Sequence, residues 1–120
     1  MHELAVTEQV LEVVLRHAAE ARASRVTHIE LVIGDMTSFV NESIQFLFDS
    51  LSEGTVAQGA QLVFRRVPVR IRCRQCGTEF EPDSIDWRCP SCAAFAGEVL
   101  AGREFYVDSI QIDEIPGEVT

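Results

Sequence analysis

Four cysteines lie in one short stretch of the chain, CRQCGTEFEPDSIDWRCPSC, and they form two C-x-x-C pairs. The first pair is Cys73 and Cys76, the second is Cys89 and Cys92, and twelve residues separate the pairs. Two cysteines three positions apart can direct both sulfurs to one ion from a tight turn, so two such turns form a tetrahedral four-sulfur cage. The spacing predicts a structural metal site without an open position for catalysis.

Zinc is the favoured ion for this cage. Rubredoxin-like iron is the main rival, because tetrahedral sulfur suits both metals. Two disulfides are the third alternative, which a reducing compartment disfavours. A module this small cannot bury enough apolar surface to fold alone, so we expect the metal to stabilise it. Gly77 directly follows the first pair and suits the positive φ that such a turn demands.

A second group of possible ligands lies at the amino terminus, which reads MHEL. The α-amine of Met1, the backbone and imidazole nitrogens of His2 and the backbone nitrogen of Glu3 can close adjacent chelate rings around one ion. Four nitrogens in a plane suit Ni(II) or Cu(II) and suit Zn(II) poorly. The first N–H groups of a helix have no intrahelical partner, so these amides can be deprotonated without breaking a helix that starts here. Taken alone, the pattern establishes only feasibility, because polar residues are ordinary at a chain terminus.

Periodicity predicts the helices that position these groups. Apolar residues recur at intervals of three and four between about residues 3 and 23, which predicts an amphipathic helix. The stretch NESIQFLFDSLSEG predicts a second helix, capped by Asn41 and stopped at Gly54. His17 falls in the first helix and His28 in the strand that follows, and we interpret both as structural.

Three strands are predicted around and between the helices. The alternating stretch VTHIELVIG ends at Gly34, QLVFRRVPVRIR spans residues 61–72, and REFYVDSIQIDE spans residues 103–114. Pro68 lacks a backbone N–H, which places the second strand at a sheet edge or gives it a bulge. One strand enters the cysteine module and another leaves it. The sequence therefore predicts an α+β fold, in which two helices pack on a small, about three-stranded sheet that carries an inserted four-cysteine zinc-ribbon module.

The predicted division of the chain follows from this insertion. The main α+β domain comprises residues 1–71 plus 104–114, and the zinc-binding domain comprises residues 72–103. Residues 115–120 are expected to form a disordered tail.

Composition excludes several classes of protein. The 120 residues include 19 acidic and 10 basic ones, for a formal net charge of -9, and every basic residue is arginine. Such a charge opposes non-specific binding to nucleic acid or to an anionic membrane. Polar residues interrupt every apolar run before the ~20 residues that a membrane helix needs, and the basic-then-apolar layout of a signal peptide is missing. We expect a soluble, cytoplasmic protein that is not an enzyme, because the common catalytic motifs are absent.

These features together resemble the HypA/HybF family of hydrogenase maturation nickel chaperones. The resemblance rests on MHEL at the start, IGD at 33–35, FLFDSL at 46–51, GTVAQGAQL at 54–62, and CRQCGTEF followed by CPSC. It implies that Met1, His2 and Glu3 bind nickel, that the four cysteines hold structural zinc, and that the protein is not an enzyme. Residues 1–71 plus 104–114 would then be the nickel-binding domain. Ala93 and Ala94 depart from the small or polar residues that often follow the second pair, so the second turn could be built differently.

The resemblance also implies partners. Nickel would be delivered to the large subunit of a [NiFe]-hydrogenase, with the maturation GTPase HypB as a partner. Some members of the family also serve urease, so urease maturation factors are further candidate partners. A monomer or a homodimer is expected. The alternative reading is a zinc-ribbon adaptor that binds protein or nucleic acid without a nickel role. A local cluster of arginines favours that alternative: Arg65, Arg66, Arg70, Arg72 and Arg74.

Overall fold

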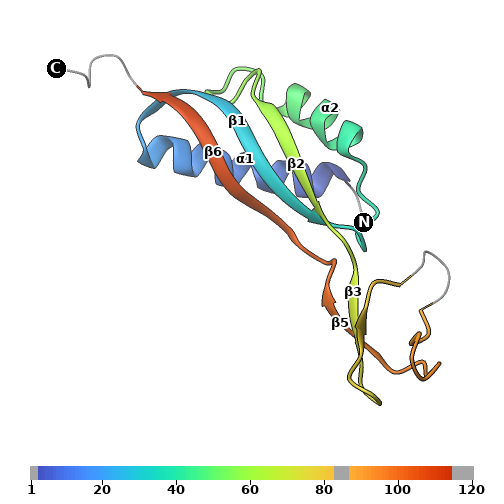
Figure 1. Ribbon diagram of the computed structural model, residues 1–120. Helices are drawn as coiled ribbons and strands as arrows, with labels where there is room; N and C mark the ends of the chain where they lie inside the picture. Colours follow the sequence, from blue (N-terminus) through green and yellow to red (C-terminus); the bar gives the residue numbers. More distant parts are fainter. Residues whose placement is uncertain (1–2, 83–86, 115–120) are drawn as a thin grey trace. The chain divides into compact units, whose positions relative to one another are not determined.

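The computed structural model describes residues 3–82 and 87–114, and its architecture is the predicted α+β fold (Figure 1). The elements in chain order are α1 (Glu3–Glu20), β1 (Ala23–Gly34), α2 (Asn41–Leu51), β2 (Gln61–Val67), β3 (Arg70–Cys73), β4 (Glu79–Phe80), β5 (Gly97–Ala101) and β6 (Phe105–Glu114). Met1, His2 and the predicted disordered tail at 115–120 lie outside the described residues.

The chain divides into two compact units. Unit 1 consists of Met1–Val32, Phe39–Arg65 and Tyr106–Thr120, and its described part contains both helices and a sheet of order β2-β1-β6. Unit 2 consists of Ile33–Ser38 and Arg66–Phe105, and it contains a second sheet of order β4-β3-β5. The three-stranded main sheet is therefore confirmed. The assignment of nickel binding to one domain and of zinc binding to the other remains a prediction.

Unit 1 is held together by the apolar stripe of each helix. In α1 the buried residues Val6, Val10 and Val14 recur at intervals of four, as the sequence predicts. Fully buried residues of the other elements, including Ile29 of β1 and Phe48 of α2, complete the core of unit 1. Burying each such side chain contributes about 1.5–3 kcal/mol. Of the helices in the described part of the chain, neither is both long enough and apolar enough to span a membrane.

The start of α2 differs from the prediction. The N-cap is Val40, with φ -104 and ψ 127, no side chain caps the helix, and Asn41 is the first helical residue. The prediction that Asn41 caps α2 is therefore wrong. The N–H of Val40 instead donates to Glu3 Oε2 at 2.6 Å. A tertiary contact with α1 thus fixes the residue before α2, where a local side-chain cap was expected.

This contact predicts a measurable role for the Glu3 side chain. Replacing Glu3 by Ala should lower the free energy of unfolding by about 1 kcal/mol, because it removes a charge-assisted hydrogen bond at a partly solvated site. Glu8 is exposed on the same helix and provides the matched control, Glu8→Ala. Urea denaturation of both variants checks this. Equal losses would show that the Val40 contact does not stabilise the fold.

The predicted strand over residues 61–72 is broken at Pro68. β2 ends at Val67, β3 begins at Arg70, and the two belong to different sheets. The missing N–H of proline explains the break, and β2 is an edge strand, as predicted. β5 was not foreseen. It pairs antiparallel with β3, with Ile71 opposite Val99.

Candidate metal centre

Two similar turns carry the four cysteines. In the first turn, which starts at the end of β3, the N–H of Gly77 donates to the carbonyl of Cys73 at 2.8 Å and the N–H of Cys73 donates to the carbonyl of Thr78 at 2.8 Å. The second turn repeats both bonds. The N–H of Ala93 donates to the carbonyl of Cys89 at 2.8 Å, and the N–H of Cys89 donates to the carbonyl of Ala94 at 3.1 Å.

Backbone conformation is the same at the equivalent positions of the two turns. Gly77 has φ 81, as the sequence predicts, and Ala93 has φ 62. The left-handed region costs a residue with a Cβ atom roughly 1–2 kcal/mol. The second turn therefore has the same design as the first despite its alanines, and the expected departure there is not seen.

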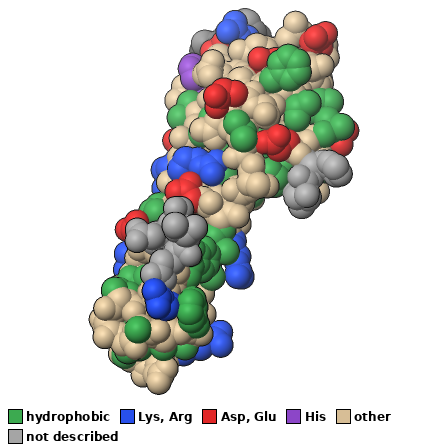
Figure 2. Space-filling view, turned by 90° about the vertical axis from the view of Figure 1, so that its right-hand side faces the viewer, with side chains coloured by type: hydrophobic (Ala, Val, Ile, Leu, Met, Phe, Trp, Pro, Cys, Tyr) green, Lys and Arg blue, Asp and Glu red, His purple; other side chains and the backbone are tan. Residues whose placement is uncertain are grey.

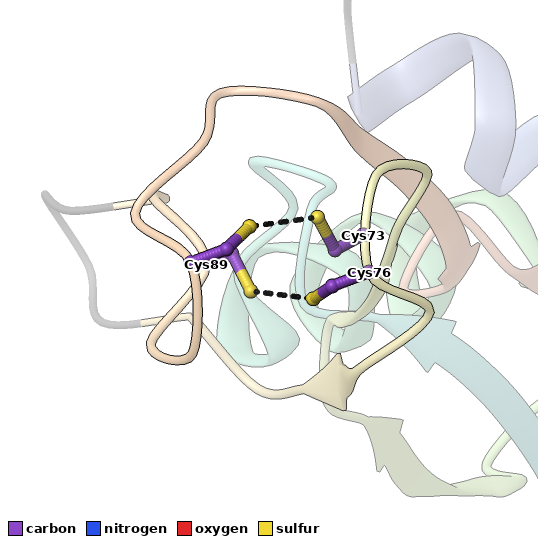
Figure 3. Close-up of side chains that lie close together, drawn as sticks. Cys73, Cys76 and Cys89 are labelled. Carbon is purple, nitrogen blue, oxygen red and sulfur yellow. Dashed lines mark hydrogen bonds between the residues drawn. The ribbon is translucent and has the colours of Figure 1, made fainter.

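The four sulfurs converge on one point. All four lie within 4.8 Å of one another, with Cys73 Sγ 3.6 Å from Cys92 Sγ and Cys76 Sγ 3.5 Å from Cys89 Sγ. Figure 3 shows sulfurs of the two turns facing each other. A Zn–S bond of about 2.3 Å implies tetrahedral S–S edges of about 3.8 Å, whereas a disulfide needs about 2.05 Å. All four cysteines are free, so the arrangement fits a metal cage and not two disulfides.

The hydrogen bonds of the turns change the acidity of the thiols. The Thr78 hydroxyl, 3.2 Å from Cys76 Sγ, and the Thr78 backbone lower the pKa of Cys76 to about 6. The backbone of Cys76 likewise lowers the pKa of Cys73. The backbone of Ala94 favours the Cys92 thiolate, but the neighbouring Cys73 thiol and burial outweigh it and raise the pKa of Cys92 to about 12. Without a cation, therefore, the Cys76 and Cys92 thiols do not ionise together, because their pKa values lie far apart.

These donors fit a divalent ion that prefers sulfur. A coordinated dication offsets the repulsion between thiolates and holds all four cysteines deprotonated. Among the described residues whose side chains can ligate a metal ion (His, Cys, Asp and Glu), these four cysteines lie close enough together to hold one. Four protein ligands in a closed cage leave no open position, so the site can support the fold but cannot activate a substrate.

The described residues contain only part of the predicted amino-terminal site. Glu3 is the first residue of α1, while Met1 and His2 lie outside the described residues. The two other histidines have partners inside their own elements. His17 Nδ1 lies 3.5 Å from Glu20 Oε1, and His28 Nδ1 lies 3.1 Å from Thr27 Oγ1.

Four arginines of the cluster form ion pairs. Within unit 2, Arg66 lies 3.0 Å from Asp35, Arg70 3.0 Å from Glu79, and Arg72 3.0 Å from Glu98. In unit 1, Arg65 lies 3.8 Å from Glu30. Such half-exposed pairs contribute little to stability, but they neutralise the positive charge. The cluster is therefore a poor surface for a nucleic acid backbone, which counts against the nucleic-acid alternative.

Fold and site together define a small α+β protein with a four-cysteine metal centre. A family profile described as "Hydrogenase/urease nickel incorporation, metallochaperone, hypA" matches residues 1–112, and the chain belongs to this family. The hydrogenase maturation factor HypA of Dehalococcoides mccartyi is 42% identical over 114 residues, covering 95% of this chain and 96% of the relative. The protein of the same name from Caldanaerobacter subterraneus subsp. tengcongensis is 39% identical over 115 residues, covering 94% and 100%.

Solved structures agree on the fold. The solution structure of the Ni metallochaperone HypA from Helicobacter pylori matches with a TM-score of 0.66 at 20% identity, covering 96% of this chain and 100% of that one. A second solution structure, of a HypA protein, matches with a TM-score of 0.71 at 22% identity, covering 93% and 96%. The fold class and the family resemblance predicted from the sequence are both confirmed.

Proposed function

We propose that this protein carries Ni(II) as cargo at its amino terminus and delivers it during maturation of a [NiFe]-hydrogenase. The observation that carries the proposal is the match of a nickel metallochaperone family over residues 1–112, which include the MHE terminus. Relatives named hydrogenase maturation factors support hydrogenase as the recipient. The family description also names urease, which makes a urease apoprotein a second candidate.

The proposed nickel ligands are the α-amine of Met1, the backbone and imidazole nitrogens of His2 and the backbone nitrogen of Glu3. Described contacts of Glu3 support this division of roles. Its carboxylate accepts the N–H of Val40, and its carbonyl accepts the Thr7 hydroxyl at 2.6 Å. Neither contact uses the Glu3 backbone nitrogen, which lies in the first turn of α1, where no intrahelical bond needs it. Deprotonated amides would also offset the repulsion between a dication and the helix amino terminus.

Structural zinc is proposed for the four cysteines, whose geometry and donor set fit it. On this proposal the protein is not an enzyme: zinc maintains unit 2, and nickel is exchanged between ligands in a complex with a partner. The maturation GTPase HypB and the hydrogenase large subunit are the proposed partners, in the cytoplasm. We propose that this chain acts in that complex as a monomer or as a homodimer.

Nickel titration of the untagged protein and of the variant His2→Ala tests the proposal. The substitution should weaken Ni(II) binding by about a hundredfold, because it removes the imidazole and one chelate ring, which corresponds to about 2.7 kcal/mol. His17→Ala is the matched control, since His17 is a histidine of α1 with a partner of its own. Calorimetry should find nickel affinity unchanged in the control. The proposal is wrong if His2→Ala binds nickel as tightly as the unaltered protein.

Nickel affinity should also depend on pH. Binding displaces protons from the α-amine and from His2, whose ordinary pKa values are about 7.7–8.0 and about 6.5. Protons therefore compete more strongly as the pH falls, and the affinity should decrease at least about tenfold between about pH 7.5 and about pH 6. Calorimetry in buffers of different ionisation enthalpy should show proton release. Equal affinity at both pH values would contradict an amine-imidazole site.

A further inference from the structure

An exposed apolar surface adjoins the amino end of α1. In unit 1, the side chain of Phe46 is 73% exposed, that of Val40 50% and that of Leu4 46%. Carboxylates lie among these side chains. We call the whole surface the acidic patch, and it consists of Leu4, Val40, Phe46, Glu3, Glu42 and Asp49.

Two hollows in unit 1 connect Phe46 with the carboxylates of the patch. One, of about 360 Å³, is lined by Glu3, Glu42, Phe46 and two further residues of α2. The other, of about 420 Å³, lies between α2 and β2 and shares Glu42 and Phe46 with the first. Figure 2 faces this side of unit 1 and shows hydrophobic and acidic side chains interspersed. Phe46 therefore separates two neighbouring depressions that a partner's side chains could fill.

The fold of unit 1 does not require Phe46. The buried residues of α2 are Ile44 and Phe48, which face the core, whereas Phe46 projects from the opposite side. A large aromatic side chain in this position, with further exposed apolar residues beside it, is typical of an interaction surface. Aromatic residues also contribute strongly to binding when a partner buries them.

The charge of the patch indicates what kind of partner fits. Glu3, Glu42 and Asp49 supply the charged groups of the two hollows, and no Lys or Arg is among the described residues that line them. A second copy of this chain would present the same carboxylates and a formal charge of -9, so self-association here is disfavoured. We propose that the acidic patch is the docking site for a basic, amphipathic segment of a partner protein. An apolar side chain of that segment packs on Phe46, and its Arg or Lys residues pair with Glu42 and Asp49.

Gln45 indicates how such a segment binds. Its Oε1 accepts the N–H of Leu62 at 2.9 Å and its Nε2 donates to Asp49 at 2.7 Å. Gln45 thus already binds the Leu62 N–H at the edge of β2, and an additional strand paired with β2 would need the same N–H. The partner segment therefore binds through its side chains, as a helix or a loop, and does not extend the sheet.

Glu3 links the patch to nickel transfer, and this step rests on the proposed function. Its carboxylate bonds to Val40 within the patch, and its backbone nitrogen is a proposed nickel ligand. A partner docked on the patch is therefore held next to the cargo. The inference is that this partner is the protein that gives nickel to the terminus or takes it away.

Nuclear magnetic resonance of the ¹⁵N-labelled full chain tests the docking site. The probe is a short amphipathic helical peptide built of Leu and Lys, with a scrambled peptide of the same composition as the control for charge alone. We expect shifts of amide signals in α2 and the first turn of α1 with the helical peptide only. Binding by the scrambled peptide with the same affinity, or shifts spread over both units, would overturn the proposal.

Variants at exposed phenylalanines sharpen the test. Phe46→Asp should weaken peptide binding at least about tenfold, as expected for a central aromatic anchor. Phe95→Asp, at a residue of unit 2 that is 78% exposed, is the matched control and should leave binding unchanged. Phe46→Ala guards against misfolding and should also weaken binding. The patch is not the docking site if the two aspartate variants bind alike.

Charge reversal separates this inference from the nickel proposal. The double variant Glu42→Lys with Asp49→Lys should lose the basic peptide and gain a matched peptide in which Glu replaces Lys. Nickel titration of the same variants should show unchanged affinity, because none of the substituted residues is a proposed ligand. Failure of the charge swap overturns the docking site and leaves the nickel proposal standing. Loss of nickel binding in His2→Ala but not in the patch variants supports the nickel site independently of docking.

Discussion

A short extension ending in proline and placed ahead of Met1 is expected to weaken Ni(II) binding by about a thousandfold or more, which is about 4 kcal/mol. The extension keeps every side chain but converts the Met1 nitrogen from an amine into an amide. The nitrogen that closes the first chelate ring is then held in a peptide bond, no amine is near enough to anchor the ion, and proline has no N–H that could be deprotonated in its place. Calorimetry against Ni(II), with competition by a chelator of known affinity, measures the difference.

The matched control is the same extension added after Thr120, at the other end of the chain. This variant has the same length and should bind nickel like the unaltered protein. Visible absorption adds a second readout, because square-planar nickel bound to four nitrogens is coloured and the extended protein should lose that band. An amino-terminal extension that leaves both affinity and spectrum unchanged would disprove the role of the α-amine.

The variant Cys73→Ser is expected to lose the bound metal and the ordered structure of unit 2. Structural zinc contributes about 10–16 kcal/mol to the folding of small zinc modules, and the sheet of unit 2 contains only short strands, from Glu79–Phe80 to Gly97–Ala101. Unit 1 has its own buried core and should keep its helices. Hydrogen exchange should therefore show loss of protection in β3, β4 and β5 and retention in α1 and β1.

The control is Ser91→Ala, a substitution of an exposed residue inside the second turn. It should keep one metal ion per chain by elemental analysis and the exchange pattern of the unaltered protein. Removing metal from the unaltered protein with a strong chelator should reproduce the effect of Cys73→Ser. If the serine variant keeps full protection in unit 2 without metal, the cage is not what stabilises this unit.

Local patterns were enough to predict most of the architecture. The helices and the main sheet follow from apolar spacing, and the cage follows from two C-x-x-C pairs, because these signals depend only on neighbours in the sequence. The start of α2 could not be predicted this way. Val40 is held by Glu3, a residue 37 positions earlier, and such a contact leaves no local pattern. β5 was missed for a similar reason: it becomes a strand by pairing with β3.

The environment of the site was less predictable than its ligands. The cysteine positions are evident, but the repeat of the first turn by Ala93 in a left-handed conformation is not, because alanine rarely adopts it. Nor does spacing point to Thr78, whose hydroxyl lies beside Cys76. The arginine cluster gave a misleading signal for the same reason, since its partners Asp35, Glu79 and Glu98 come from separate parts of the sequence.

Arginine forms ion pairs in both units, and every basic residue of the chain is arginine. Guanidinium groups do not react with reagents that acylate amines, so a chain that starts at Met1 offers such reagents a single primary amine. Mild acylation would then label one position and leave the surface ion pairs unchanged. Bound nickel should protect that position, so the rate of labelling would report nickel occupancy in the protein with its natural sequence.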